Sequence, residues 1–132
     1  MRKIILFAMC ALALVACKKE VPEMEVMYSI TGDCTNVTEN SVTITCSSVT
    51  DDYFDIIERG LVYSTNSDVP NHDGTWRSVE GGFDKEEYTV AIEGLQSGTT
   101  YYYRSYVYIR YEFNIKRYFF GEVKSFTTLP AV

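Results

Sequence analysis

Apolar and polar residues alternate with a period of two along most of the chain. In 41–46, apolar Val42, Ile44 and Cys46 alternate with serine and threonine, and 88–93 repeats the pattern with tyrosine, valine and isoleucine. Successive side chains of a strand point to opposite faces, so this alternation predicts strands with one buried face. No apolar period of 3.6 residues, the mark of an amphipathic helix, follows the N-terminal region.

Turn-forming glycine, asparagine and aspartate separate segments rich in β-branched and aromatic residues. These segments predict seven strands, near residues 26–36, 41–48, 58–64, 75–80, 87–93, 100–110 and 116–128. Seven short strands with regular turns favour an all-β fold, a seven-stranded antiparallel immunoglobulin-like sandwich. About 105 residues suffice for one such domain, which we place at 26–130.

The N-terminal region has a different pattern. Arg2 and Lys3 precede an apolar block of 12 residues, Ile4 to Val15, which ends in small residues. As a helix the block would be about 18 Å long, too short to cross a hydrocarbon layer of roughly 30 Å. A basic start, a short apolar middle and a small-residue end are typical of a secretory signal peptide, which we assign to residues 1–16.

The end of this block, Leu14-Val15-Ala16-Cys17, resembles the lipobox of bacterial lipoproteins. The resemblance implies cleavage before Cys17 and acylation of its sulfur, with residues 17–25 as the lipidated cysteine and a charged tether. Because each buried methylene contributes about 0.8 kcal/mol, two or three acyl chains would hold the protein on a membrane. The tether is similar to those of Bacteroidota lipoproteins exported to the outer membrane. We therefore expect outer-membrane anchoring at the cell surface, with the periplasmic face as the alternative.

Cleavage also changes the charge of the chain. Loss of Arg2 and Lys3 lowers the basic count from 12 to 10 against 18 acidic residues, so the mature chain of 116 residues has a formal charge of −8. Such a chain repels phosphates, which argues against nucleic acid as a partner.

After cleavage and lipidation, Cys34 and Cys46 remain as an even pair in an oxidising compartment. If both sulfurs point into the core they can form a disulfide, worth roughly 3 kcal/mol. The alternative is two free thiols that pack as small apolar side chains.

Three stretches, 95–101, 58–64 and 121–128, resemble the corner before the sixth strand, the third strand and the last strand of fibronectin type III domains. The first reads Leu-Gln-Ser-Gly-Thr-Thr-Tyr and ends at Tyr101. The resemblance implies that Tyr101 forms a tyrosine corner, with its ring in the core and its hydroxyl on a nearby backbone group. The family often buries a tryptophan on its second strand, whereas the lone tryptophan here is Trp76, near the fourth strand.

Two regions are candidate binding surfaces. The first is a pair of loops at one end of the sandwich, with the aromatic residues Tyr53, Phe54, Tyr111 and Phe113. Apolar rings at an exposed loop tip invite a partner, although the same rings could fold back as a lid on the core.

The second region is the outer face of strand 100–110. If Tyr101 points inward, the period of two places Tyr102, Arg104, Tyr106 and Tyr108 on the outer face. These side chains could contact a glycan or a protein. They could instead form cross-strand pairs that stiffen the sheet.

The sequence predicts no enzyme, cofactor or metal site. His72, the one histidine, lies in a turn-rich loop, and no motif places a nucleophile near it. We expect a lipid-anchored, non-enzymatic binding or adhesion module for a glycan or surface protein. The alternative is a structural accessory subunit of a larger outer-membrane complex.

Overall fold

A computed structural model describes residues 28–49, 55–68, 74–83, 85–110 and 114–132. Its nine strands are β1 (Tyr28–Ile30), β2 (Cys34–Thr35), β3 (Val42–Val49), β4 (Asp55–Ser64), β5 (Thr75–Val79), β6 (Glu87–Ile92), β7 (Thr100–Arg110), β8 (Lys116–Phe120) and β9 (Lys124–Thr127). The described residues form no α-helix, in agreement with the alternating pattern.

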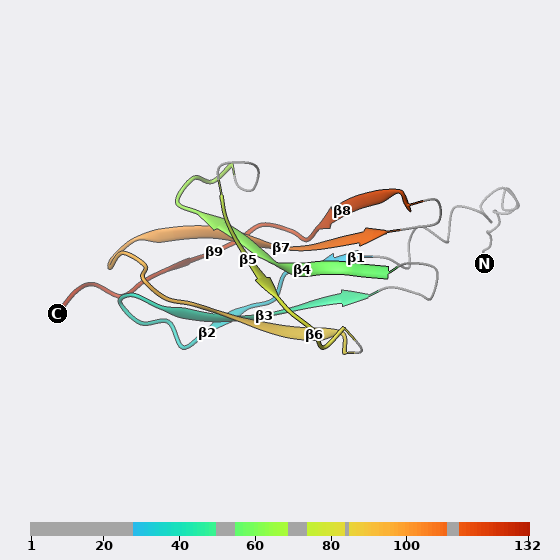
Figure 1. The fold of residues 1–132 in the computed structure, drawn as a ribbon. Coiled ribbons are helices and arrows are strands. Elements are labelled where there is room, and N and C mark those ends of the chain that lie inside the picture. Colours follow the sequence, from blue (N-terminus) through green and yellow to red (C-terminus); the bar gives the residue numbers. More distant parts are fainter. Residues whose placement is uncertain (1–27, 50–54, 69–73, 84, 111–113) are drawn as a thin grey trace, which may run out of the picture.

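The strands form two antiparallel sheets that pack face to face as a sandwich (Figure 1). In the four-stranded sheet, β3 pairs with β1, β2 and β6. In the five-stranded sheet the order is β5-β4-β7-β8. Strand β9 also pairs with β7, along its first residues, whereas β8 pairs with its last ones. The predicted all-β immunoglobulin-like sandwich is confirmed.

Nine strands arise from the seven predicted because the first and the last are each divided in two. The interruption between β1 and β2 faces the one between β8 and β9. A Cβ atom on Gly121 would lie 2.4 Å from the hydroxyl oxygens of both Thr31 and Ser105. The Gly121 N–H also donates to the Ser105 carbonyl over 3.0 Å. Close packing between the first strand, β7 and the last strand therefore requires glycine at this point.

The core lies between the sheets and follows the alternation of the sequence. Residues 87–92 of β6 alternate strictly between exposed and buried positions. The buried set from both sheets comprises Val42, Ile44, Cys46, Leu61, Tyr63, Tyr88, Val90, Ile92, Leu95, Tyr101, Tyr103 and Phe126. Fully burying an aliphatic or aromatic side chain of this size contributes roughly 1.5–3 kcal/mol, so this set is a main source of stability.

One cation lies inside this apolar layer. Arg59 of β4 is 1% exposed and donates to the Ser48 hydroxyl and to the carbonyls of Lys85 and Gly82, over 2.8–3.0 Å. Its guanidinium also lies 4.6 Å from the centre of the Tyr88 ring. These contacts let β4 hold the turn between β5 and β6 against the sandwich.

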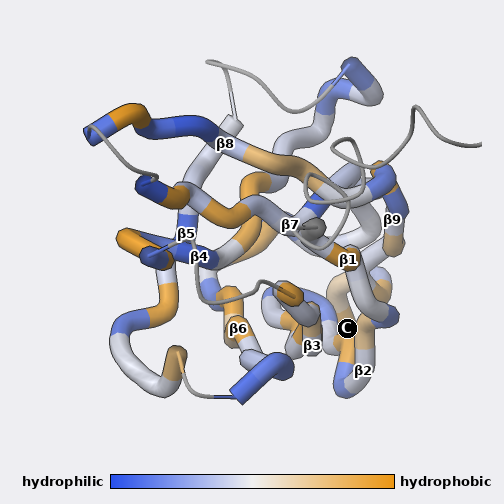
Figure 2. Tube along the Cα trace, turned by 90° about the vertical axis from the view of Figure 1, so that its right-hand side faces the viewer, coloured by the Kyte–Doolittle hydropathy of each residue, from blue (hydrophilic) through white to orange (hydrophobic). Residues whose placement is uncertain are grey.

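Strand pairing brings several strand ends to one end of the sandwich. Tyr28 lies opposite Val49, Asp55 opposite Arg110, and Arg110 opposite Lys116. Contacts of β1 with β7 and β8 place the start of β1 at the same end as the start of β4, the end of β7 and the start of β8 (Figure 1). Figure 2 looks onto this end, with β8 in the upper part and β6, β3 and β2 of the four-stranded sheet in the lower part.

Candidate functional site

The sequence-predicted residues of the anchor and of the loops lie outside the described part of the chain. This holds for Cys17 and for the loop residues Tyr53, Phe54, Tyr111 and Phe113. Lipidation and loop-end binding therefore stay predictions.

Cys34 and Cys46 are free cysteines, so the predicted disulfide is not formed. Cys34 of β2 lies opposite Ile44, which places Cys46 two residues further along β3. Such diagonal neighbours lie about 7–8 Å apart, beyond the Cα separation of 4.4–6.8 Å that a disulfide usually spans. The buried Cys46 thiol instead contacts the Gly32 backbone and the Tyr88 hydroxyl. The alternative, two free thiols packed at the core, describes the structure.

Tyr101 has the geometry of a tyrosine corner. It is 7% exposed, and its hydroxyl oxygen accepts a hydrogen bond of 2.9 Å from the Gln96 N–H, five residues upstream. Its ring stacks on Phe126 with centroids 5.6 Å apart. The contact fastens the turn before β7 to the core.

The predicted outer-face residues of β7 lie on the outer face of the five-stranded sheet, together with their cross-strand partners. Tyr106 lies opposite Phe120, and Tyr108 lies opposite Tyr118. However, Tyr106 is fully buried (0% exposed), so it cannot contact a ligand as predicted. The period of two correctly assigned Tyr106 to the outer face. It could not show that side chains of β5 and β8 cover Tyr106 there.

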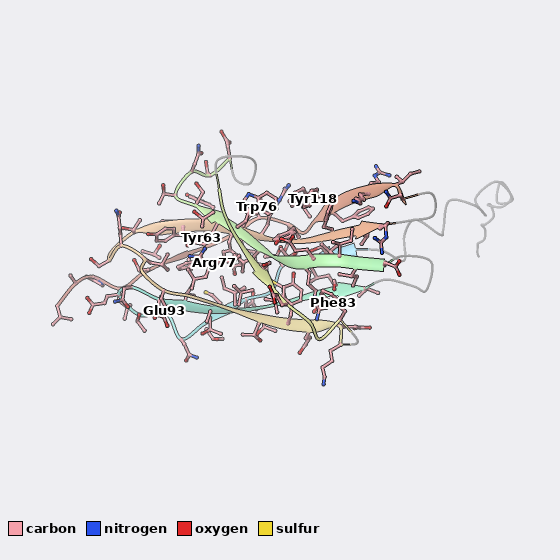
Figure 3. All side chains as sticks on the ribbon, in the orientation of Figure 1. Tyr63, Trp76, Arg77, Phe83, Glu93 and Tyr118 are labelled. Carbon is pink, nitrogen blue, oxygen red and sulfur yellow. The ribbon has the colours of Figure 1, made fainter. Side chains whose placement is uncertain are left out.

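These covering side chains form an aromatic cluster on the outside of the five-stranded sheet. Trp76 of β5 lies 4.8 Å from Tyr106, 5.7 Å from Tyr118 and 6.1 Å from Phe120, between ring centroids and at interplanar angles of 62–70°. Tyr108 stacks on Tyr118 at 4.2 Å. Figure 3 shows Trp76 and Tyr118 side by side on this outer face. We call Trp76, Tyr108, Tyr118 and Phe120 the aromatic patch.

The patch remains accessible above the buried Tyr106. Tyr118 is 47% exposed, and Trp76, Tyr108 and Phe120 are half-buried. Because the indole is inclined at 62° to both the Tyr118 and Phe120 rings and nearly equidistant from them, it caps the pair. The cluster therefore presents rigid rings whose orientation is set by their neighbours.

Charged groups border the patch. The Arg104 guanidinium lies 4.1 Å from the centre of the Phe120 ring, and burial lowers its pKa. The Tyr106 hydroxyl donates to the Glu58 carboxylate. Burial, and then this carboxylate, raise the pKa of Tyr106 above its ordinary value. The bond fixes Glu58 beside the patch as a hydrogen-bond acceptor.

A shallow pocket of about 310 Å³ continues from Glu58 away from the patch. Its lining comes from β4, β5 and the turn that follows, namely Ile57, Glu58, Ser78, Val79, Glu80, Gly81 and Phe83. Two carboxylates, Glu58 and Glu80, thus line a recess next to the rings. The pocket can accept hydroxyl or cationic groups.

The described residues contain no group of three or more histidine, cysteine or acidic side chains that could hold a metal ion. His72 lies outside them. Within the same part of the chain, no helix has the length and apolar character needed to span a bilayer.

Sequence reasoning missed Trp76, Tyr118 and Phe120 as members of the site. Trp76 reaches the face of Tyr106 because Val62 of β4 pairs with Trp76 on one side and with Arg104 on the other. This three-strand register is a tertiary property. The available signal was the lone tryptophan. It lies near the fourth predicted strand and not on the second, where fibronectin type III domains often bury one.

Comparison with known proteins supports the fold. No protein-family model matches the chain, and a search of curated proteins finds no relative. Among solved structures, the sensor domain of the anti-sigma factor RsgI4 in Pseudobacteroides cellulosolvens superposes with a TM-score of 0.60 and 17% identity, covering 80% of this chain and 97% of that one. The fibronectin type III domain of the human KIAA0970 protein gives 0.53 and 20%, covering 86% of this chain and 81% of that one. The shared property is the fold, a fibronectin type III-like sandwich.

Proposed function

We propose that this chain is a lipid-anchored, non-enzymatic module that binds a glycan through the aromatic patch. The partly exposed cluster of Trp76, Tyr108, Tyr118 and Phe120 carries the proposal. Aromatic rings offer apolar area with few rotatable bonds, so they lose little entropy when they bind the apolar face of a sugar ring.

The polar border suits the same ligand class. Arg104 supplies donors and Glu58 supplies acceptors within the same face, and the sugar hydroxyls need both. A protein interface usually takes 20–30 residues a side, and four rings with two charged neighbours are far fewer. This size favours a glycan over the protein ligand and over the accessory-subunit alternative.

The anchor is supported by the signal peptide and lipobox pattern that ends at Cys17. We expect acylated Cys17 at the N-terminus and display at the surface of the outer membrane. Mass spectrometry of the protein purified from its native membrane tests this directly. An uncut N-terminus, or an unmodified thiol at Cys17, would contradict the anchor.

Glycan binding is tested by affinity electrophoresis of the purified mature protein in gels that contain a soluble β-glucan, an α-glucan or a mannan. Retardation by at least one polysaccharide is expected. Trp76→Ala and Tyr118→Ala should each weaken that retardation about tenfold or more, because each removes a ring from the patch.

Leu129→Ala is the matched control, since Leu129 is 52% exposed but lies beyond β9, away from the patch. Equal retardation of Trp76→Ala and the unaltered protein would exclude the patch as the binding site. Absence of retardation by every polysaccharide, together with capture of a defined membrane protein, would favour the protein ligand.

A further inference from the structure

We propose a second interaction surface, a basic corner of the sandwich that docks on anionic lipid headgroups. The corner is formed by Arg110, Ile115, Lys116 and Arg117, around the end of β7 and the start of β8. The inference rests on the proposed lipid anchor but not on the proposed glycan site.

The topology places this corner where the chain enters the domain. Tyr28 lies opposite Val49 at the end of β3, and Lys116 lies opposite Arg110 at the end of β7. Contacts join β1 to both β7 and β8. The start of β1, which follows the anchored segment in the sequence, therefore lies at the end that carries β8 (Figures 1 and 2).

The segment between Cys17 and β1 is too short to let this end leave the membrane. Ten residues, 18 to 27, separate Cys17 from β1. Ten residues can span at most about 35 Å. The 11 residues of β7 alone extend about 37 Å. The end with β8 thus faces the bilayer, and the opposite end of the sandwich points away.

Charge selects one corner of that end. Arg110, Lys116 and Arg117 are all exposed, and Asp55 is the one carboxylate paired with them among the described residues, at 3.5 Å from Arg110. The opposite corner, around the start of β6, carries exposed Glu80, Glu86 and Glu87 and a single exposed lysine, Lys85. Anionic headgroups attract the first corner by about 1 kcal/mol for each basic residue near the surface. They repel the carboxylates of the second corner.

An apolar side chain completes the basic corner. Ile115 is 53% exposed and directly precedes the two cations. An exposed apolar residue between basic ones can enter the headgroup region while the charges remain at the phosphates. We therefore expect the domain to tilt so that the start of β8 contacts the membrane.

The test uses the mature lipidated protein, reconstituted in vesicles of phosphatidylcholine with and without phosphatidylglycerol. Backbone hydrogen exchange is measured by mass spectrometry. Exchange of the 114–118 segment should be at least about fivefold slower in the anionic vesicles, and high salt should remove the difference. Exchange of the 94–99 turn, at the far end, should not change.

A Lys116→Gln, Arg117→Gln double variant should lose this protection. Lys85→Gln is the matched control, because Lys85 is an exposed lysine at the same end but at the acidic corner, and it should keep the protection. Normal exchange of the far turn shows that each variant is folded.

Equal protection in neutral and anionic vesicles would overturn headgroup recognition. Protection that rises with the protein-to-lipid ratio would also overturn it, since a second copy would then cover the corner. If the lipidated protein shows no slower exchange of 114–118 in anionic vesicles, this inference alone is refuted. If the native protein carries no acyl chains, the anchor is refuted.

Discussion

Two buried tyrosine hydroxyls between the sheets, those of Tyr88 and Tyr103, donate to backbone carbonyls. Tyr88 donates to the Gly60 carbonyl and Tyr103 to the Gly32 carbonyl, each over 2.8 Å. Burial raises the pKa of both hydroxyls, so they remain protonated donors throughout the physiological range. Each ring thus adds apolar area to the core without leaving a polar atom unsatisfied.

Tyr101→Phe tests the value of such a bond. The substitution keeps the ring but leaves the partly buried Gln96 N–H without its acceptor, which should cost about 1–2 kcal/mol of unfolding free energy in urea titrations. Tyr102→Phe is the control, since the half-buried Tyr102 hydroxyl makes no hydrogen bond with the described residues. Equal stability of the two variants would contradict the tyrosine corner.

Cys34 and Cys46 should both react as free thiols. Alkylation of the mature protein in denaturant without reductant should modify Cys34 and Cys46 completely. In the native protein Cys46 should react much more slowly than Cys34, because Cys46 is buried and burial raises its pKa, which depletes the reactive thiolate. A mass lower by two hydrogens, with neither sulfur alkylated, would restore the disulfide.

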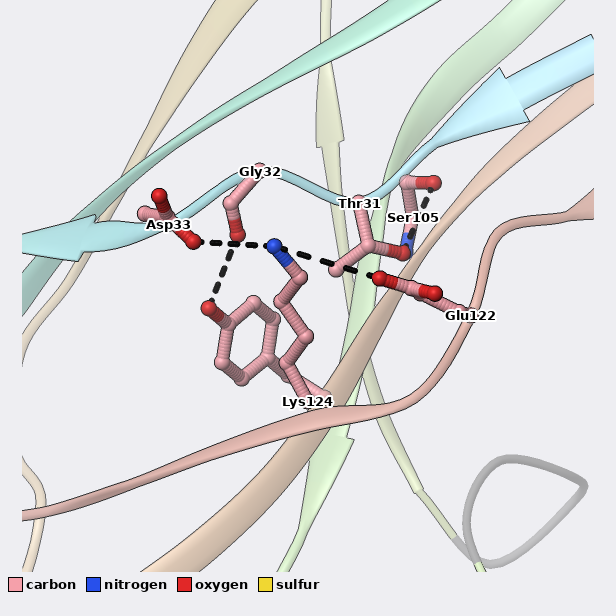
Figure 4. A network of polar contacts seen from close by, with 7 residues as sticks. Thr31, Gly32, Asp33, Ser105, Glu122 and Lys124 are labelled. Atoms are coloured by element: carbon pink, nitrogen blue, oxygen red, sulfur yellow. Dashed lines mark hydrogen bonds and ion pairs between the residues drawn. The ribbon is translucent and has the colours of Figure 1, made fainter.

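The divided first and last strands are fastened to β7 by a buried polar cluster. The hydroxyl oxygens of Ser29 and Ser105 are 2.7 Å apart, and the Ser105 N–H donates to the Thr31 hydroxyl over 3.0 Å. Figure 4 shows Thr31 and Ser105 beside the ion pairs of Lys124. Since the strand ladder is interrupted there, side chains supply the missing hydrogen bonds.

Gly121→Ala should disrupt this junction. The added methyl group would overlap the hydroxyls of Thr31 and Ser105 and lie 2.8 Å from the Thr31 nitrogen, so we expect a loss of roughly 1–3 kcal/mol in unfolding free energy. Val123→Ala, at an exposed position of the same interruption, should change it little. A Gly121→Ala variant as stable as the Val123→Ala control would show that the junction can yield.

The molecule as a whole joins its two sheets by polar contacts as well as by the core. Lys124 of β9 donates to the exposed Asp33 carboxylate over 2.8 Å, and Asp33 lies between β1 and β2 in the other sheet. The hydrogen bond from Lys124, followed by its charge, lowers the pKa of Asp33 below its usual 3.8. The contact therefore stabilises the folded state while Asp33 is ionised.

This lowered pKa predicts the direction of a pH effect. The contribution of Asp33 is fully present above pH 3.8 and is lost as the pH falls through the lower value of the folded state. Asp33→Asn should accordingly lower the urea midpoint at neutral pH, and the difference should shrink below pH 3.8. Asp68→Asn, at an exposed turn position, is the control. A difference that persists undiminished in acid would contradict the assignment.

The sequence by itself determined the class of fold, because the period of two depends only on which residues can face a core. It located the seven segments that contain the nine strands, and it assigned Tyr101 inward and Tyr106 outward. Only the tertiary structure decided what covers those faces. Strand register separates Cys34 from Cys46, and it brings Trp76, Tyr118 and Phe120 over Tyr106 from strands distant in sequence. Periodicity assigns a side chain to a face, whereas contacts between faces depend on which strands pair and in what register.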